Sequence, residues 1–433
     1  MASVTTFDFE DPIAVIDGVR TPFAKAWTNY KDWNHADLGR QAVAELVNRT
    51  EIDPQRIDEL IFGCVAAPAN GPNVGREVVL RSQVPNHVSA STVQMYCASS
   101  AYAAVQGVNS LLAGTSEVVI AGGVEAMSAA RAQFSLELTH ALQEAASAKT
   151  LQGRVKALGG VKPADLKPQT PAIEEPTTGM SMGESAEVMA KEYGISREAQ
   201  DEYTEMTHHR AAQAYEEGRF PEVMTVLAGK KFDEPVERDT LVRPDTSKEK
   251  MAGLRPVFDK KHGTITAANA SPLTDGASAV MLMRRSTARR LGLQPRAFVR
   301  SYAHVGLDIR EHNLLLGPTF ATPIALERAG LTLDDMDLVE MHEAFAAQTL
   351  ANLEIWKSEE LCQSLGLDEA IGEVDMDTFN VNGGSVSIGH PFGATGGRMI
   401  MQLAGEMERR DVNLGLLTMC AAGGLGLSMV LER

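Results

Sequence analysis

The sequence predicts an α/β fold built from two similar halves that pack face to face. Amphipathic helical stretches alternate with short β-branched runs along most of the 433 residues, which is typical of sheets covered by helices. The order of segments also repeats, because a helix, a turn and a strand over 38–63 return over 323–344. Alternation of this kind indicates parallel strands, so we expect a parallel sheet in each half.

Each half ends in a similar way. The runs 276–284 and 424–432 are rich in Gly and apolar residues and predict buried closing strands. Residues 128–262 are more polar and rich in Pro and Lys, which indicates an inserted, mostly helical domain, and the polar segment 354–377 predicts a surface excursion. The predicted domains are an N-terminal half (1–127 with 263–288), the insert (128–262) and a C-terminal half (289–433).

Composition excludes several classes of protein. The net charge of −17 would repel a phosphate backbone over most of the surface, so nucleic acid is not expected as a partner. No apolar run reaches the roughly 20 residues of a transmembrane helix. The N-terminus lacks the pattern of a signal or transit peptide, which predicts a cytoplasmic protein. Four cysteines without paired spacing indicate reduced thiols and no metal site.

Basic residues gather in the second part of the predicted insert. Such a cluster could bind a polyanion, or it could be a solvated face with interleaved acids. Sequence alone leaves both readings open. The residues are Lys230, Lys231, Arg238, Arg243, Lys248, Lys250, Arg255, Lys260 and Lys261.

Cys97 is the first candidate for chemistry. It follows a predicted strand at 91–93 and precedes a helix whose apolar positions recur from Ala101 to Leu112. A thiol at a helix N-terminus meets unpaired N–H groups and the positive end of the dipole, which favour the thiolate. The residue is either a nucleophile or a small buried hydrophobe.

Three further segments carry reactive side chains. The glycine-rich run 380–389 lacks the lysine of a phosphate loop and leads to His390 just before a helix, where a histidine is either structural or catalytic. Cys420 precedes glycines whose N–H groups suit an oxyanion hole. His342 and Glu343 lie at a predicted strand-to-helix junction, and Ala346 excludes the zinc-protease pattern there.

Taken in this order, the segments around Cys97, His342, His390 and Cys420 resemble the thiolases, and the resemblance runs from 16–23 to the last strand. It implies a five-layer αβαβα sandwich of two duplicated α/β halves, with an inserted loop domain that binds coenzyme A. It also implies a homodimer or homotetramer. Coenzyme A would be a co-substrate, and no cofactor would be bound permanently.

The same resemblance implies roles for single residues. Cys97 would be the acylated nucleophile, His390 its activator, and Cys420 the acid and base. His390 and His342 would bind the enolate oxygen, while the backbone N–H groups of Cys97 and Ala422 would bind the tetrahedral oxyanion. The residues expected to bind substrate or coenzyme A are Ser271, Arg243, Met182 and Phe345.

At three positions the chain departs from the usual thiolase motifs, and two of these departures indicate which substrates it cleaves. His342 stands where most thiolases have asparagine, and histidine there resembles the thiolase subunit of fatty-acid oxidation complexes. This implies cleavage of 3-ketoacyl-CoA in β-oxidation and a hydratase/dehydrogenase α subunit as partner. Ser181 stands where short-chain biosynthetic thiolases carry histidine, which favours longer chains. Ala422 replaces the usual glycine, so its conformation must be one that alanine tolerates.

The helical segment 134–158 resembles an extra region through which such subunits touch a membrane or their partner; it could equally be a plain surface helix. Three other functions stay open. One is an acetoacetyl-CoA thiolase (acetyl-CoA C-acetyltransferase) working in the condensing direction. Another is a non-catalytic lipid-carrier or scaffold subunit on the same fold, against which the intact Cys97, His390 and Cys420 count. A ketosynthase would use two histidines and would not need Cys420.

Overall fold

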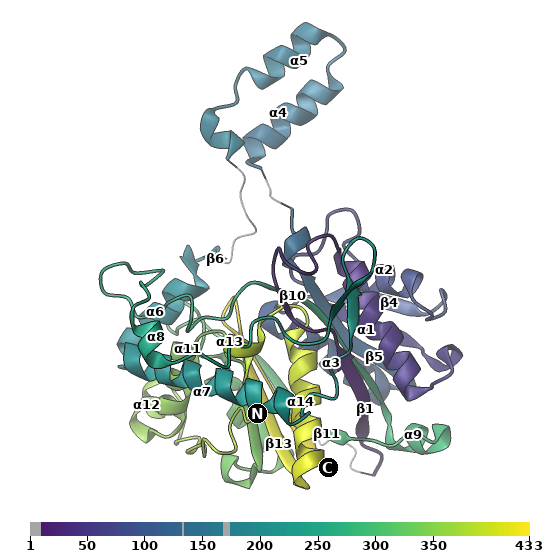
Figure 1. The fold of residues 1–433 in the computed structure, drawn as a ribbon, viewed down its shortest axis with the longest axis vertical. Coiled ribbons are helices and arrows are strands. Elements are labelled where there is room, and N and C mark those ends of the chain that lie inside the picture. The colour runs from purple at the N-terminus through teal and green to yellow at the C-terminus, as the bar shows by residue number, and fades with distance from the viewer. Residues whose placement is uncertain (1–9, 132–133, 168–173) are drawn as a thin grey trace. The chain divides into compact units, whose positions relative to one another are not determined.

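The computed structural model describes residues 10–131, 134–167 and 174–433, and it separates the chain into two units (Figure 1). The smaller unit is 130–181, and the larger one contains the remaining residues. The predicted insert 128–262 is therefore divided, because residues 182–262 pack into the larger unit. This segment brings α6 (Met182–Glu192), α7 (Arg197–Glu216) and α8 (Lys248–Ala252) to the site described below.

The smaller unit is a pair of helices, α4 (Leu136–Ser147) and α5 (Leu151–Leu158), followed by a 3-10 turn at Pro163–Leu166 and the short strands β6 (Glu174–Glu175) and β7 (Met180–Ser181). Ser135 and Thr150 start the two helices, since each side chain accepts a backbone N–H of the first turn. The predicted helical segment 134–158 is thus present as two helices. No helix of the described residues is long and apolar enough to cross a membrane.

The larger unit contains a mixed sheet, in the order β12 (Leu338–Met341), β13 (Leu414–Ala421), β14 (Leu425–Glu432), β11 (Ala297–Gly306), β1 (Ile13–Arg20), β10 (Thr274–Arg284), β5 (Val118–Ala126), β3 (Glu59–Gly63) and β4 (Ser89–Val93), with β2 (Ala24–Lys25) beside β10. The expectation of purely parallel sheets is wrong. Parallel pairing joins β3 to β4 and β5, and β12 to β13, whereas the closing strands are antiparallel. The reason is clearest at β13 and β14, because the turn 422–424 between them is too short for a crossover.

The two halves are still visible within this sheet. In each half a parallel pair, β3 with β5 or β12 with β13, is followed by the antiparallel closing strand β10 or β14. The halves meet where β1 and β11 pair over only Ile13–Val15 and Ala297–Val299. The duplication expected from the sequence is therefore present, as two sheet halves joined by a short seam.

Helices form three layers around the halves. On one outer face lie α1 (His35–Thr50) and α2 (Val74–Arg81), and on the other lie α10 (Gly317–Ala329) and α11 (Ala346–Trp356). The central layer consists of α3 (Ser99–Ala113) and α14 (Thr395–Arg410), which contact each other and both halves, and their side chains share one apolar core. This arrangement agrees with the αβαβα sandwich expected from the sequence.

The central helices approach each other closely. A Cβ added to Gly396 of α14 would lie 2.4 Å from the backbone nitrogen of Ala101 in α3, so glycine is required there. Ala101 and Gly396 each lie in the first turn of their helix, so α3 and α14 approach each other near their N-termini. This contact brings together residues that are distant in sequence.

Smaller elements complete the larger unit. They are β8 (Val226–Ala228), β9 (Glu234–Val236), α9 (Arg285–Leu291), α12 (Glu359–Ser364) and α13 (Ser385–Ile388). The segment 354–377 is less superficial than expected, because two of its own residues, Trp356 and Cys362, are fully buried.

Candidate active site

Cys97 lies in a sharp turn between β4 and α3. The residue before it, Tyr96, has a φ of 45°, a left-handed conformation that a bulky side chain adopts only when its surroundings hold it there. Ser99 supplies that restraint, because its hydroxyl accepts the N–H of Met95 at 2.9 Å and donates to the carbonyl of Tyr96 at 2.6 Å. The thiol is thus held at the N-terminus of a central helix, as the sequence predicts.

The charge state of Cys97 differs from the expectation. Burial raises the pKa of the thiol to about 11, although the backbone N–H groups of Ala422 and of Cys97 itself act in the opposite direction. The backbone N–H groups thus favour the thiolate, as the sequence predicts, but burial outweighs them. The thiol needs a base when it reacts.

His390 has the geometry of that base. Its Nδ1 lies 2.6 Å from the hydroxyl of Thr395, and this hydroxyl donates its only proton to the carbonyl of Pro391 at 3.0 Å. With the hydroxyl proton on Pro391, Thr395 accepts the Nδ1 proton, and this assignment leaves a free lone pair on Nε2 of the neutral ring. Burial and then the charge of Arg398 lower the pKa of His390 to about 3, so the ring is neutral at rest.

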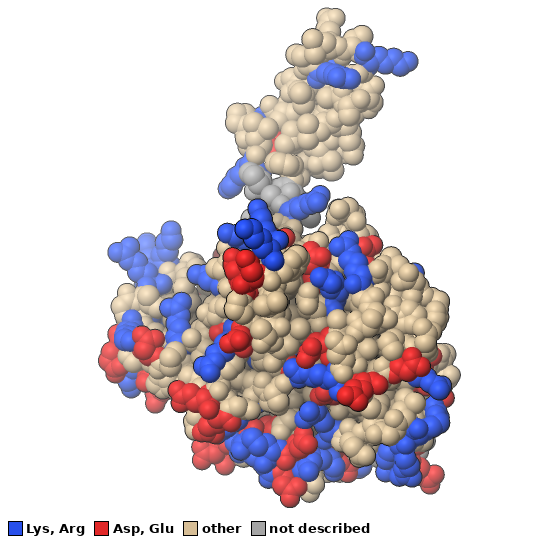
Figure 2. Space-filling model, turned by 45° about the vertical axis from the view of Figure 1, so that its right-hand side comes forward, with Lys and Arg blue, Asp and Glu red and all other residues tan. Residues whose placement is uncertain are grey.

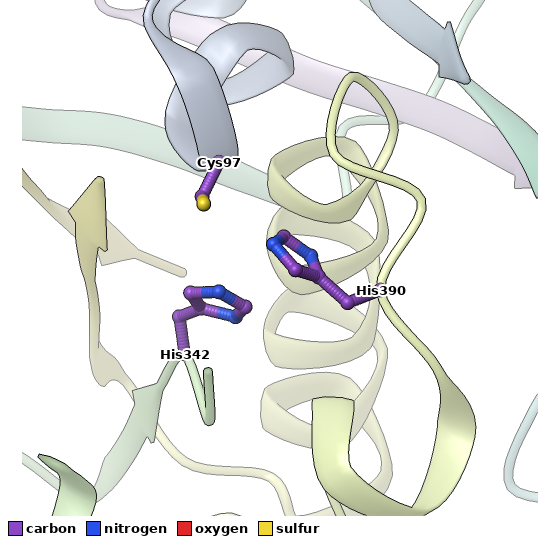
Figure 3. Close-up of side chains that lie close together, drawn as sticks. All are labelled: Cys97, His342 and His390. Carbon is purple, nitrogen blue, oxygen red and sulfur yellow. The ribbon is translucent and has the colours of Figure 1, made fainter. Parts of the chain in front are cut away.

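His342, the residue directly after β12, faces the same space. Figure 3 shows the side chains of Cys97, His342 and His390 converging, and one ligating atom of each lies within 4.8 Å of the others. The two imidazole centroids are 4.2 Å apart. The Nδ1 atom of His342 lies 2.9 Å from the hydroxyl of Ser385. Within the described part of the chain neither Nε2 atom has a hydrogen-bond partner, although both residues are buried. Such free polar atoms indicate a site prepared for a ligand.

Glu343, the neighbour of His342, is a structural brace. Its buried carboxylate accepts hydrogen bonds from the hydroxyls of Tyr203 (2.7 Å) and Thr207 (3.0 Å), the amide of Asn380 (2.8 Å) and the backbone N–H of Val386 (3.1 Å). These bonds tie α7, the glycine-rich loop and α13 to the end of β12. They fix the place of His342.

Cys420 lies at the end of β13 and is 1% exposed. Burial, followed by the nearby Cys97, raises the pKa of its thiol well above the usual range. Ala422 follows in the turn, and the positive φ values there belong to Gly423 (77°) and Gly424 (66°), so alanine is tolerated at 422. Met182 and Phe345 pack in the apolar cluster that contains Cys420.

A cavity of about 640 Å³ is lined by Phe258, whose ring centroid is 6.3 Å from that of Phe345, but not by Cys97, His342, His390 or Cys420 themselves. Its lining includes both residues expected to bind coenzyme A, Ser271 and Arg243, together with Lys250 from the basic cluster. The remaining basic residues of that cluster do not line it. Elsewhere acidic and basic side chains interleave over the face that Figure 2 shows.

One segment connects the cavity with the reactive groups. Ser271 lines the cavity and donates its backbone N–H to the carbonyl of Ala344 at 3.0 Å, two residues after His342. Leu273 pairs with His390, whose N–H donates to the hydroxyl of Thr274 at 3.1 Å. The cavity wall and the catalytic loop therefore share a backbone.

Residues that sequence reasoning missed support the site from behind. The buried carboxylate of Glu125 accepts the backbone N–H groups of Val65 (3.1 Å), Ala66 (2.9 Å) and Gly393 (3.0 Å), and the last of these holds the loop after His390. Arg398, Ser385 and Glu340 form a chain of hydrogen bonds that reaches His342. A signal existed for Glu340 alone, because positions 340 and 342 share a face of the predicted strand.

Two groups among the described side chains could offer three atoms to a metal ion. They are Cys97 with His342 and His390, and His35 with Cys64 and Glu125. In the second group the carboxylate oxygens are already engaged by backbone N–H groups. The expectation that this protein needs no metal stays a prediction.

Comparison with known proteins decides the family. The thiolase N-terminal domain matches residues 13–286, and the thiolase C-terminal domain matches 293–433. The chain belongs to the thiolase family. The resemblance stated from the motifs is thereby confirmed, and this thiolase is an enzyme of the acyltransferase class.

Several relatives of this thiolase are named. It is similar to the 3-ketoacyl-CoA thiolase of Aeromonas salmonicida (strain A449), with 48% identity over 97% of this chain and 96% of the relative. The 3-ketoacyl-CoA thiolase of Escherichia coli O1:K1 / APEC is 46% identical over 98% of this chain and 97% of the relative. The crystal structure of the Bacillus anthracis acetyl-CoA acetyltransferase has a TM-score of 0.84 and 31% identity, covering 98% of both chains.

Proposed function

We propose that this thiolase is a 3-ketoacyl-CoA thiolase (acetyl-CoA C-acyltransferase) that shortens 3-ketoacyl-CoA in fatty-acid β-oxidation. The observation that carries the proposal is the convergence of the half-buried Cys97 with the buried imidazoles of His390 and His342, whose Nε2 atoms have no hydrogen-bond partner among the described residues. A nucleophile, a base and a second polar group converge there, which is what acyl transfer requires. The 3-ketoacyl-CoA thiolases at 46–48% identity support the choice of substrate.

The first half-reaction breaks the carbon–carbon bond. His390 takes the Cys97 proton on Nε2, and the sulfur attacks C3 of the substrate. The backbone N–H groups of Cys97 and Ala422 stabilise the tetrahedral oxyanion. Its collapse breaks the C2–C3 bond and leaves the electron pair on the acetyl-CoA enolate, whose oxygen faces His342 and His390. The thiol of Cys420 protonates C2, and acetyl-CoA departs.

The second half-reaction releases the shortened chain. The Cys420 thiolate takes the proton from a new coenzyme A thiol, and the coenzyme A thiolate attacks the acyl group on Cys97. The bond between acyl carbon and Cys97 sulfur breaks, and His390 returns its proton to Cys97. Both proton carriers then regain their starting states.

The cavity beside the site suits coenzyme A. Arg243 and Lys250 offer positive charge for the phosphates, and Ser271 lies where the wall approaches His342 and His390. Met182 and Phe345, packed near Cys420, offer an apolar surface for the acyl chain. We propose that residues 182–262 are the part of the insert that binds coenzyme A.

Assembly follows from the same interpretation. We propose a homodimer or homotetramer that works with a hydratase/dehydrogenase α subunit, on the grounds that His342 replaces the usual asparagine. The condensing acetyl-CoA acetyltransferase is the second candidate function, since the Bacillus anthracis enzyme has this fold. Its lower identity of 31% places it behind the degradative thiolases.

The test is coenzyme A-dependent cleavage of a medium-chain 3-ketoacyl-CoA, combined with intact-mass analysis and peptide mapping of the acyl adduct. We expect cleavage, with the adduct on Cys97. Cleavage of acetoacetyl-CoA alone would favour the second candidate. Folded protein that forms no adduct and cleaves neither substrate, even with an α subunit added, would contradict both.

A further inference from the structure

His342 and His390 present the same atom, Nε2, to the same space, yet the proposed reaction needs one ring to accept a proton and the other to donate a hydrogen bond. Thr395 settles the matter for His390, because it accepts the Nδ1 proton. For His342 the deciding contact is the one between Nδ1 and the hydroxyl of Ser385, at 2.9 Å. Which atom carries the proton depends on the other partners of Ser385.

The hydroxyl of Ser385 has one other hydrogen-bond partner among the described residues. The Nη2 atom of Arg398 donates to its oxygen at 3.2 Å. A guanidinium can only donate, so it occupies a lone pair of Ser385 and leaves the hydroxyl proton without any acceptor except Nδ1 of His342. Donation to Nδ1 requires that the neutral ring carry its own proton on Nε2.

Arg398 is itself held in place. It is fully buried in α14, and its Nη1 atom donates to Glu340 at 2.9 Å and to Gln402 at 2.5 Å. Glu340 lies two residues before His342 in β12, so the pleat of the strand turns both side chains to the same face. Strand, central helix and α13 thus meet behind one imidazole.

We infer that Ser385, oriented by Arg398 and Glu340, is a positioning residue that keeps the proton of His342 on Nε2, so that His342 donates while His390 accepts. The two rings then have opposite tautomers in one pocket. This inference rests on the proposed function, in which a hydrogen-bond donor stabilises the enolate oxygen formed by cleavage of the C2–C3 bond.

The tautomer of His342 should matter for carbon–carbon cleavage but not for acyl exchange by the same enzyme. Cleavage develops charge on the enolate oxygen, which faces His342. Exchange of a saturated acyl group between coenzyme A molecules forms no enolate and develops its charge at the backbone N–H groups of Cys97 and Ala422. Loss of the Ser385 hydroxyl should therefore impair cleavage much more than exchange, whereas a general disturbance of the site impairs both.

The experiment compares kcat for cleavage of a medium-chain 3-ketoacyl-CoA with the rate of exchange of labelled coenzyme A into a saturated acyl-CoA of the shortened length. For Ser385→Ala we expect cleavage to fall on the order of 10- to 100-fold, less than the full loss of an oxyanion donor, and exchange to stay within about twofold. Ser385→Thr retains the hydroxyl and should restore most of the cleavage.

Ser387, two residues after Ser385 in the same helix, offers a matched control. Ser387 is also buried in α13, and its hydroxyl donates to the carbonyl of Gly384 at 3.0 Å and lies 3.2 Å from the hydroxyl of Thr207; among the described residues it has no hydrogen bond to His342. Ser387→Ala should change cleavage and exchange by equal factors. Thermal midpoints of all variants report the shared cost of losing a buried hydroxyl.

A double-mutant cycle closes the test. His342→Asn supplies an amide donor that has no tautomers, so adding Ser385→Ala to it should produce no further selective loss of cleavage. An equal fall of cleavage and exchange in Ser385→Ala, or the same selective fall in the His342→Asn background, would overturn the inference. Absence of cleavage by the wild-type enzyme would instead count against the proposed function.

A second variant is available if Ser385→Ala does not fold. Arg398→Lys keeps the charge beside Glu340 and is expected to show the same selective loss of cleavage. An equal loss of cleavage and exchange would overturn the inference.

Discussion

Cys64 follows β3 in the first half of the sheet, and His342 follows β12 at the corresponding place in the second half. Cys64 forms a buried group with His35 and Glu125, which we call the Glu125 cluster; His342 lies with Cys97 and His390 in the group that we propose to be catalytic together with Cys420. The two groups have similar side chains and follow equivalent strands. They differ in the groups that surround each thiol and in the exposure of the thiol.

In the Glu125 cluster the carboxylate accepts three backbone N–H groups and lies 3.4 Å from Nε2 of His35, so it serves the fold. Among the described residues neither ring nitrogen of His35 has a hydrogen-bond partner, and the same is true of the Nε2 atoms of His342 and His390. The thiols differ more clearly, because Cys64 is buried beside a carboxylate whereas Cys97 is half-buried beside two imidazoles. Duplication of a fold therefore does not duplicate a site; the groups around each thiol and its access decide which half becomes reactive.

The largest contrast should come from removing Cys97. Cys97→Ala should lower cleavage by about four orders of magnitude or more, because no covalent intermediate can form. Steady-state kinetics and intact-mass analysis after incubation with substrate measure both effects. An acyl adduct on Cys64 in this variant would break the comparison, since it would show that the Glu125 cluster is reactive.

Cys420→Ala should rank next. We expect cleavage to fall about 10²- to 10⁴-fold, the usual contribution of a general acid or base. Acylation of Cys97 by an activated saturated thioester should persist, because that step needs no proton from Cys420. Single-turnover acylation measured by mass spectrometry separates the two steps, and a parallel loss of acylation would remove the distinct role of Cys420.

The pH dependence of alkylation should distinguish Cys97 from Cys64. Since the pKa of Cys97 is raised to about 11, its thiolate fraction should increase with pH up to that value. The rate of Cys97 modification by iodoacetamide should therefore rise about 100-fold from pH 7 to pH 9. Cys64 should stay unmodified in the folded protein, because burial and Glu125 raise the pKa of its thiol too. A plateau for Cys97 below pH 8 would indicate a resting thiolate.

Glu125→Gln should act mainly on stability. The amide would turn N–H groups toward backbone N–H donors, and the lost hydrogen bonds should cost about 1–3 kcal/mol of unfolding free energy. Cleavage should fall less than in Cys420→Ala, through loosening of the loop that Gly393 anchors. Chemical denaturation and kinetics on the same preparation test this, and unchanged stability would contradict the proposed brace.

The smallest effect belongs to Cys64→Ala. The thiol makes a long contact of 3.9 Å to Glu125 and has no contact with the catalytic group. Cleavage should stay within about twofold of the wild-type value, and stability should fall by no more than about 1–2 kcal/mol. A large loss of kcat with normal stability would mean that the two groups communicate.

Much of the site could be predicted from local sequence. Cys97 and Cys420 each stand between an apolar run and small residues, and His390 follows a glycine-rich run, patterns that are visible without any structure. Ser271 and Arg243 line one cavity, and their binding of coenzyme A stays a prediction. Glu125, Ser385 and Arg398 were missed, because nothing in their neighbouring residues marks them. Their partners are distant in the chain, as with Arg398 and Glu340, which are 58 residues apart.

The charge state of Cys97 shows the same limit. A helix N-terminus is a local feature and favours the thiolate, whereas the burial that outweighs it arises from the packing of both halves around α3 and α14. The parallel sheets expected from alternating helices were likewise overruled at β10 and β14, where the chain returns antiparallel.

By itself the sequence determined the duplicated α/β plan, the family and the residues able to react, because periodicity, turn residues and motif order are local properties of the chain. Only the tertiary structure decided which half became reactive, which ring nitrogen of each imidazole carries the proton and how far the pKa of each thiol is raised. Those properties depend on desolvation and on hydrogen bonds between segments that meet only after folding.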